Sequence, residues 1–254
     1  MDCRPRAFVI GLLIAGANVG IAYASEILVG SGEFPPYTTE KTADRGCVIS
    51  IVKSAYEVEG WTIDVEFMPW PRTQTMLSRG KIDASAYAYS RPDKREEFIF
   101  PENPVASEVY KFVFPADAII EWDTYEDFRD KTIIINSSYT YNEEFYKALD
   151  EYYIERIDVA SELQNLRMLT KHRADLTIVN QKVFDKYMSE LSAEERSELY
   201  IDPKPALTVL GYLIFSRSDS EKSLKLAEIF DNGYRKIRDR EDLREFFETC
   251  GFER

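Results

Sequence analysis

The chain has 254 residues, with 32 Lys and Arg against 45 Asp and Glu, so its formal net charge is −13. Apolar residues make up 44% of the chain, which is enough for a core and excludes bulk disorder. The acidic balance argues against a nucleic-acid-binding protein, and one His with three Cys leaves little for a zinc site. The length fits one large domain or two small ones.

The pattern of the first 24 residues predicts a signal peptide for export. Arg4 and Arg6 precede an apolar run at 7–21, and Ala22-Tyr23-Ala24 forms a cleavage site of the A-x-A type. The alternative is a buried helix or a membrane anchor, but the run is short and ends in small residues. We therefore predict cleavage before Ser25, a periplasmic location, and a mature chain of 230 residues with no membrane span and a net charge of −14.

Two cysteines remain in the mature chain, Cys47 and Cys250. Export makes a disulfide between them chemically feasible, and such a bridge would contribute about 4–5 kcal/mol by restricting the unfolded chain. The alternative is two separate buried thiols. Sequence spacing does not decide between them, because it does not show that the two side chains meet.

Strand and helix patterns alternate through the first half of the mature chain. Short apolar runs bounded by Gly or Pro predict strands, and apolar residues spaced three and four apart predict helices. In chain order we expect a strand at 27–30, a helix at 48–56, a strand at 63–68, a helix ending at Gly80, a strand at 82–86 and a strand at 109–114.

The same alternation restarts after Pro115. We expect a short helix at 125–128, a strand at 132–135, a helix at 141–149, a strand at 157–160, a helix from Ser161 to about 171, a strand at 176–179, a helix at 183–191, a strand at 207–215 and charged helices at about 220–237 and 240–248. This order predicts α/β units with a largely parallel sheet.

The long runs at 109–114 and 207–215 predict two crossings between lobes. They divide the mature chain into lobe 1, at 25–112 and 211–254, and lobe 2, at 113–210. We therefore expect a ligand cleft between two α/β lobes, because clefts between domains are favoured places for small ligands.

Four stretches together resemble the bacterial solute-binding protein family 3, the amino-acid-type periplasmic receptors of ABC transporters. They are 28–37, Pro69-Trp70-Pro71-Arg72 with 80–84, 90–95 with 98–101, and 164–166 with 173–175. The Pro-Trp-Pro-Arg version resembles a divergent branch of that family. The resemblance implies a type II periplasmic-binding-protein-like fold, with a two-strand hinge and lobes that close over a ligand.

The resemblance also implies an anchor for a carboxylate. Arg95 ends a Ser-x-x-x-x-Arg pattern, and in amino-acid receptors the matching arginine grips the ligand's carboxylate with a bidentate fork. The alternative for Arg95 is a surface salt bridge with Asp93 or Glu96. Ser90 matches a companion position that donates a hydrogen bond, and its alternative is a turn or helix cap.

Aromatic residues match positions that line the cleft in the family, namely Phe34, Tyr37 and Trp70. Their alternative is the core of a lobe, where most such side chains go. Tyr87 and Tyr89 lie two residues apart, so alternation places both on one face of their strand, and we include Tyr87 among the ligand-binding residues.

Lobe 2 supplies three further candidates. Ser138 and Tyr139 lie where a strand joins a helix, a place suited to an anion or to an ordinary capped turn. Asn180 falls where amino-acid receptors carry an aspartate that pairs with the ligand's ammonium. An amide offers no charge there, so we expect a small polar or carboxylate ligand without a strongly held ammonium, unless Glu33 supplies the acid.

These expectations combine into a non-catalytic receptor that passes its ligand to an ABC transporter permease in the inner membrane. The alternatives are an enzyme on the same scaffold, similar to cyclohexadienyl dehydratase, or a receptor for a sensor without transport. We expect a monomer with no cofactor, no metal ligands and no catalytic residues, since no nucleophile–base pair is evident.

Overall fold

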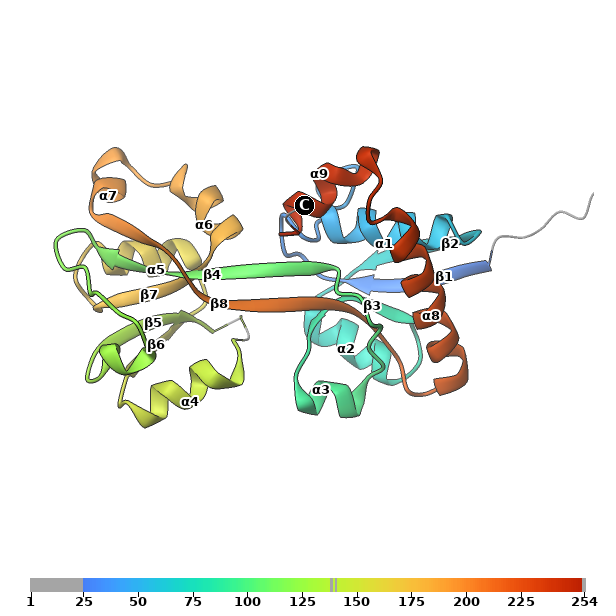
Figure 1. Cartoon of the computed structure of the whole chain (residues 1–254), viewed down its shortest axis with the longest axis horizontal. Coiled ribbons are helices and arrows are strands. Elements are labelled where there is room, and N and C mark those ends of the chain that lie inside the picture. The colour runs from blue at the N-terminus through green and yellow to red at the C-terminus, as the bar shows by residue number, and fades with distance from the viewer. Residues whose placement is uncertain (1–24, 138, 140, 253–254) are drawn as a thin grey trace, which may run out of the picture.

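The computed structural model describes residues 25–137, 139 and 141–252. The predicted signal peptide and Ser138 lie outside the described residues. The described chain forms two lobes, and the strands β4 (Ala106–Pro115) and β8 (Leu199–Phe215) run from one lobe to the other (Figure 1). No helix within the described part of the chain combines the length and the apolar character that a membrane crossing requires.

Lobe 1 contains three strands and five α-helices (Figure 1). They are β1 (Ser25–Ser31), α1 (Cys47–Glu57), β2 (Trp61–Phe67), α2 (Trp70–Ser78), β3 (Ala84–Tyr89), α3 (Pro92–Glu97), α8 (Ser220–Ile237) and α9 (Arg244–Thr249), with the 3₁₀ turn η2 (Glu241–Leu243) before α9. Lobe 2 contains η1 (Tyr125–Phe128), β5 (Thr132–Asn136), α4 (Glu143–Glu151), β6 (Glu155–Val159), α5 (Glu162–Leu169), β7 (Leu176–Asn180), α6 (Gln181–Met188) and α7 (Ala193–Ser197).

The strands form one sheet in the order β2-β1-β3-β8-β4-β7-β5-β6. β1 pairs in parallel with β2 and β3, and β5 pairs in parallel with β6 and β7. The two crossing strands are antiparallel to each other and to β3 and β7. Each lobe is thus a parallel α/β unit, and the antiparallel pair in the middle joins the two units.

Separate hydrophobic cores mark the two lobes. Val48 and Phe230 belong to the core of lobe 1, and Phe128 and Ile135 belong to a core of lobe 2. β4 passes from the first core to the second between Ala106 and Tyr110, and β8 returns between Leu207 and Leu213. Close to these crossing points the strands lie between the lobes rather than inside either of them.

The elements follow the predicted order, with three differences. α3 and α7 are short helices that the sequence patterns do not predict. β8 starts at Leu199, eight residues before the predicted start. The extra length contains Pro203 and Pro205, which interrupt the apolar pattern, and the pairing with β4 shifts register beside Pro205.

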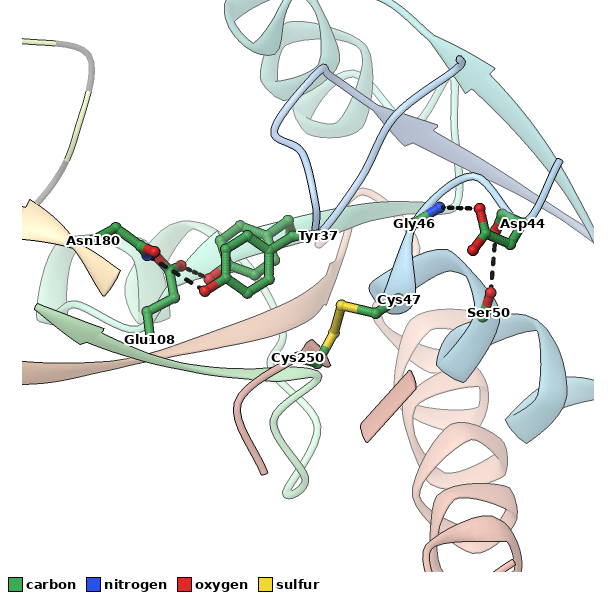
Figure 2. The surroundings of a disulfide bond; sticks show 9 residues. Tyr37, Asp44, Gly46, Cys47, Ser50, Glu108, Asn180 and Cys250 are labelled. Atoms are coloured by element: carbon green, nitrogen blue, oxygen red, sulfur yellow. Dashed lines mark hydrogen bonds between the residues drawn. A yellow bond between two sulfur atoms is a disulfide. The ribbon is translucent and has the colours of Figure 1, made fainter. Parts of the chain in front are cut away.

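Cys47, at the start of α1, and Cys250, just after α9, are joined by a disulfide with a Cα–Cα distance of 5.8 Å (Figure 2). The carbonyl of Cys250 accepts a hydrogen bond from the backbone N–H of Ser107 in β4, at 2.9 Å. Gly251 follows with a φ of 88°, and a side chain there would meet the carbonyl oxygen of Ser107 at 1.9 Å. The bridged segment therefore packs directly against a crossing strand.

Candidate functional site

A cavity of about 430 Å³ lies between the lobes. Its lining comes from five places in the chain: the loop after β1, helix α2, strand β3, the start of α3, and the turn after β5. The lining residues are Glu33, Phe34, Trp70, Gln74, Tyr87, Ala88, Tyr89, Arg91, Lys94 and Tyr139. All of these residues except Tyr139 belong to lobe 1. The ring of Tyr139 is therefore the contribution of lobe 2 to the lining, and it faces a wall built by lobe 1.

The wall is aromatic, and its rings contact one another. Phe34 stacks on Tyr37 with ring centroids 5.0 Å apart and lies 5.7 Å from Tyr87. Tyr139 meets Phe34 edge-on at 5.9 Å, which is a ring contact between the two lobes. Trp70 packs over Gly32, where a Cβ atom would come within 2.6 Å of the indole ring.

A short turn sets Phe34 and Tyr37 in place. The backbone N–H of Tyr37 donates to the carbonyl of Phe34 at 2.9 Å, and the N–H of Phe34 donates to the carbonyl of Thr38 at 2.8 Å. The peptide bond between Pro35 and Pro36 is cis. Tyr37 is almost fully buried, so its ring supports the cavity wall from behind.

Glu108 of β4 is fully buried behind this wall and accepts hydrogen bonds from four side chains. The hydroxyl of Tyr87 donates to Oε1. Oε2 accepts from the amide of Asn180 at 2.6 Å and from the hydroxyls of Tyr110 at 3.0 Å and Tyr89 at 3.3 Å. These donors come from β3, β4 and β7, so the carboxyl group links both lobes to the crossing strand.

Gly211 explains how Tyr87 reaches this carboxyl group across the sheet. β8 lies between β3 and β4, and Gly211 of β8 is paired with Tyr89 on one side and Ala106 on the other. A Cβ atom at Gly211 would lie 2.1 Å from the Tyr87 ring. The bare backbone therefore lets the tyrosine pass over the intervening strand.

Burial raises the pKa of Glu108 to about 8, although its hydrogen bonds from Tyr110 and Asn180 act in the opposite direction. The carboxyl group is therefore mainly protonated at neutral pH. Glu162, at the start of α5, is a second buried acid, and burial raises its pKa to about 7. Burial also raises the pKa values of Tyr37, Tyr89 and Tyr110, so these phenols stay neutral.

Asn180 ends β7 and is fully buried. Its Nδ2 donates to Glu108 and, at 3.4 Å, to the hydroxyl of Tyr37, and Figure 2 shows the three side chains together. Its Oδ1 accepts from the backbone N–H groups of Lys182 and Val183, so it caps the start of α6. Both ends of this amide are thus engaged by the protein itself.

The charged side chains on the cavity wall have partners. Arg91 forms a bidentate pair with Asp93, with distances of 3.1 and 2.7 Å. Lys94 pairs with Glu97 at 2.8 Å. Glu33 accepts hydrogen bonds within its own loop, from the backbone N–H of Glu40 and from the hydroxyl of Thr39.

The structure places Arg95 and Ser90 at the side of the cavity rather than on its wall. The Nε of Arg95 donates to Oγ of Ser90 at 2.7 Å, and its guanidinium lies 4.8 Å from the ring centre of Phe100. Ser90 lines a neighbouring cavity of about 760 Å³ that shares Tyr89 and Arg91 with the first. Asp93, a partner expected as the alternative for Arg95, pairs with Arg91 instead.

The structure therefore brings Phe34, Trp70, Tyr87 and Tyr139 to one cavity, with Tyr37 and Asn180 directly behind it. The binding residues predicted from the sequence did not include Glu108, Gln74, Tyr89, Arg91 and Lys94. A signal for Glu108 exists, because it is a lone acid next to the apolar crossing run 109–114. Within the described residues, no group of three or more His, Cys, Asp and Glu is arranged to hold a metal ion.

No protein-family model and no curated protein sequence matches the chain. Solved structures do match over nearly its whole length. The probable amino-acid ABC transporter extracellular-binding protein of Bacillus subtilis is 18% identical, with a TM-score of 0.71 over 88% of this chain and 96% of that one. The fold is that of the two-lobed periplasmic binding proteins.

Two other solved structures with this fold carry different roles. A histidine kinase sensor domain with similarity to periplasmic binding proteins is 15% identical, with a TM-score of 0.66 over 90% of this chain and 96% of that one. An ancestral amino-acid-binding protein, a precursor of cyclohexadienyl dehydratase, is 14% identical, with a TM-score of 0.63 over 89% of this chain and 95% of that one. The predicted two-lobed α/β fold is confirmed, and at these identities the likeness establishes the fold alone.

Proposed function

We propose that this chain is a periplasmic solute-binding protein of the amino-acid type, which captures a small polar ligand between its lobes and closes over it. The observation that carries the proposal is the aromatic wall shared by the lobes, where Tyr139 of lobe 2 faces Phe34 of lobe 1 across the cavity. Bending of β4 and β8 changes the distance between the lobes, so a ligand in the cavity that contacts residues of both lobes favours closure.

The polar end of the ligand is proposed to be a carboxylate bound near the start of α3. Arg91 and Lys94 already line the cavity, and Arg95 with Ser90 lies beside it. Guanidinium groups suit carboxylates because they offer two parallel N–H donors. The exposed side chain of Arg95 has room to exchange its contacts with Phe100 and Tyr212 for such a ligand.

Delivery to an ABC transporter permease is the proposed use of the bound ligand, with the mature protein acting as a monomer without a cofactor. The likeness to an ABC transporter binding protein supports this choice. A sensor partner is the second candidate, supported by the likeness to a kinase sensor domain. Catalysis is not proposed, because the buried acid Glu108 lies behind Tyr87 and does not line the cavity.

The test is thermal melting of the purified protein against amino acids, small carboxylates, amines and prephenate. A ligand at 100 times its dissociation constant adds about 2.7 kcal/mol of stability, which is readily seen as a higher melting temperature. Small-angle scattering with the same ligand should show a smaller radius of gyration. Tyr139→Ala should lower the affinity for the ligand at least tenfold. Tyr153 is an exposed tyrosine of the same lobe, and Tyr153→Ala should leave the affinity unchanged. Turnover of prephenate, or a panel without any response, would argue against this function.

A further inference from the structure

Glu108 is a buried acid for which the described part of the chain offers no cationic partner. Within residues 25–137, 139 and 141–252, its carboxyl group bonds only to the hydroxyls of three tyrosines and to one amide. A buried carboxylate without a countercharge is strongly disfavoured. The group therefore holds a proton in the free protein, as its raised pKa of about 8 indicates.

Two of the tyrosines bonded to Glu108 are also part of the cavity wall. Tyr87 and Tyr89 direct their hydroxyls to the carboxyl group, and both line the cavity. Their rings meet at right angles, 5.5 Å apart, and Phe34 and Trp70 complete this side of the wall. The phenol groups of Tyr87 and Tyr89 thus connect the acid to the cavity.

A box of aromatic rings with an acid behind it has a clear chemical preference. The negative faces of aromatic rings attract ammonium, guanidinium and quaternary ammonium groups within about 6 Å. A phenol that donates a hydrogen bond to a carboxylate becomes more electron-rich, because hydrogen bonds in such a chain polarise one another. Ionised Glu108 therefore makes Tyr87 and Tyr89 better cation hosts.

We propose that the cavity takes a ligand with a cationic nitrogen group, and that Glu108 supplies the countercharge through Tyr87 and Tyr89. This inference rests on the proposed receptor function and names the ligand class. It also replaces the expectation drawn from Asn180 alone. The acid stands at 108 instead of 180, and the amide of Asn180, 2.6 Å from it, avoids the repulsion of a second carboxylate.

Binding then couples to a proton. The cation enters the aromatic box, the O–H bond of the Glu108 carboxyl group breaks, and its proton leaves for solvent, so the net charge of the site is conserved. The other titratable groups facing Glu108 are Tyr37, Tyr87, Tyr89 and Tyr110. The raised pKa values of Tyr37, Tyr89 and Tyr110 keep these three phenols neutral through this change. The charged groups on the wall, Glu33, Arg91 and Lys94, are engaged with their own partners.

The experiment measures binding by calorimetry from pH 6.5 to 8.5, with two pairs of probes that differ mainly in charge. Choline is compared with the neutral 3,3-dimethylbutan-1-ol, and L-arginine with L-citrulline, which keeps the same amino-acid group and has a neutral side chain. We expect a cation of one or both pairs to bind at least tenfold more tightly than its neutral partner at pH 8.5. Its affinity should fall about tenfold at pH 6.5, as Glu108 becomes protonated.

Variants separate the charge from its structural role. Glu108→Gln keeps the shape and should make cation affinity low and independent of pH. Tyr110→Phe removes a hydrogen bond to the carboxylate and should move the pH midpoint upward, with the preference for cations retained. Tyr125→Phe is the matched control, since its hydroxyl donates to the carbonyl of Ala206 in lobe 2, and it should change nothing.

The outcomes distinguish this inference from the receptor function itself. Binding of a neutral or anionic compound in preference to both cations would overturn the inference and leave the receptor in place. Cation binding that is the same at pH 6.5 and 8.5, or unchanged in Glu108→Gln, would also overturn it. A protein that binds neither these probes nor any compound of the wider panel would contradict both proposals.

Discussion

The backbone N–H of Ser107 donates to the carbonyl of Cys250 at 2.9 Å, so the segment closed by the disulfide is hydrogen-bonded to the residue before Glu108. The bridge itself ties α1 to the end of the described chain, and Figure 2 shows it close to the group formed by Tyr37, Glu108 and Asn180. The crossing strand is thus hydrogen-bonded to a segment that is held by a covalent link between residues 203 positions apart.

Loss of this link should weaken lobe 1. Replacing both Cys47 and Cys250 by Ala should lower the free energy of unfolding by about 4–5 kcal/mol, because the unfolded chain is no longer restricted. Urea unfolding of the variant and the parent, each with and without a reductant, measures the change. The reductant should destabilise the parent and leave the variant unaffected, and equal sensitivity of the two proteins would contradict the prediction.

Stability should fall as the pH rises from about 5 to 8. Glu108 and Glu162 have pKa values of about 8 and 7 in the folded protein, raised from an ordinary 4.5. Between pH 4.5 and these values the unfolded chain releases protons that the folded chain retains, so deprotonation favours unfolding. Urea unfolding at several pH values gives the free energy of unfolding as a function of pH. Glu108→Gln should reduce the fall of this free energy up to about pH 8, and Glu162→Gln should reduce it only up to about pH 7. A parent protein that gains stability over this range would refute the assignment.

Gly211→Ala should disrupt the contact between Tyr87 and Glu108, because the new methyl group would lie 2.1 Å from the tyrosine ring. We expect a loss of about 1–3 kcal/mol in the free energy of unfolding, typical of overpacking. In a protein that also carries Tyr87→Ala, the new methyl group meets no ring, so Gly211→Ala should lower the free energy of unfolding by clearly less. A double-mutant cycle measures this difference. Additive effects of the two substitutions would show that the ring does not depend on the bare backbone.

Asn180→Asp should place a second carboxyl group beside Glu108, where the amide now donates at 2.6 Å. Loss of the donor and repulsion between the two acids should cost about 1–3 kcal/mol at pH 8 and less at pH 5, where a proton is shared between them. Asn142→Asp is the matched control. Asn142 caps α4 by accepting from the backbone N–H of Phe145, a role that aspartate fills equally well.

The sequence predicts most of the fold because each lobe repeats the same alternation of strand and helix patterns. Buried parallel strands are apolar runs, and the helices between them carry apolar residues at helical spacing, as in Val48 and Val52 of α1. α3 and α7 were not predicted because they are only six and five residues long, too short for a periodic pattern. The start of β8 was obscured by prolines that lie at irregularities of its pairing with β4.

The aromatic positions of the site were named from the sequence, but the acid behind them was not. Phe34 and Trp70 stand beside prolines, outside any periodic face, which distinguishes them locally. Glu108 is marked in the sequence only as a lone acid beside the apolar run 109–114, and its surroundings form only when β3, β4 and β7 come together with β8 lying between β3 and β4. Arg95 shows the opposite case, because its motif is visible in the sequence but its contacts depend on Phe100 and Tyr212.

The core of lobe 1 draws on both ends of the described chain, from Ile27 to Phe247 and Cys250, whereas the cores of lobe 2 use only residues between Tyr110 and Leu207. The cores of lobe 2 are therefore formed by one continuous segment, whereas β1 and β3 share their core with β8, α8 and α9 from the other end of the described chain. All the residues that line the binding cavity lie between Glu33 and Tyr139, yet most of them belong to the lobe whose core also needs the last helices of the described chain.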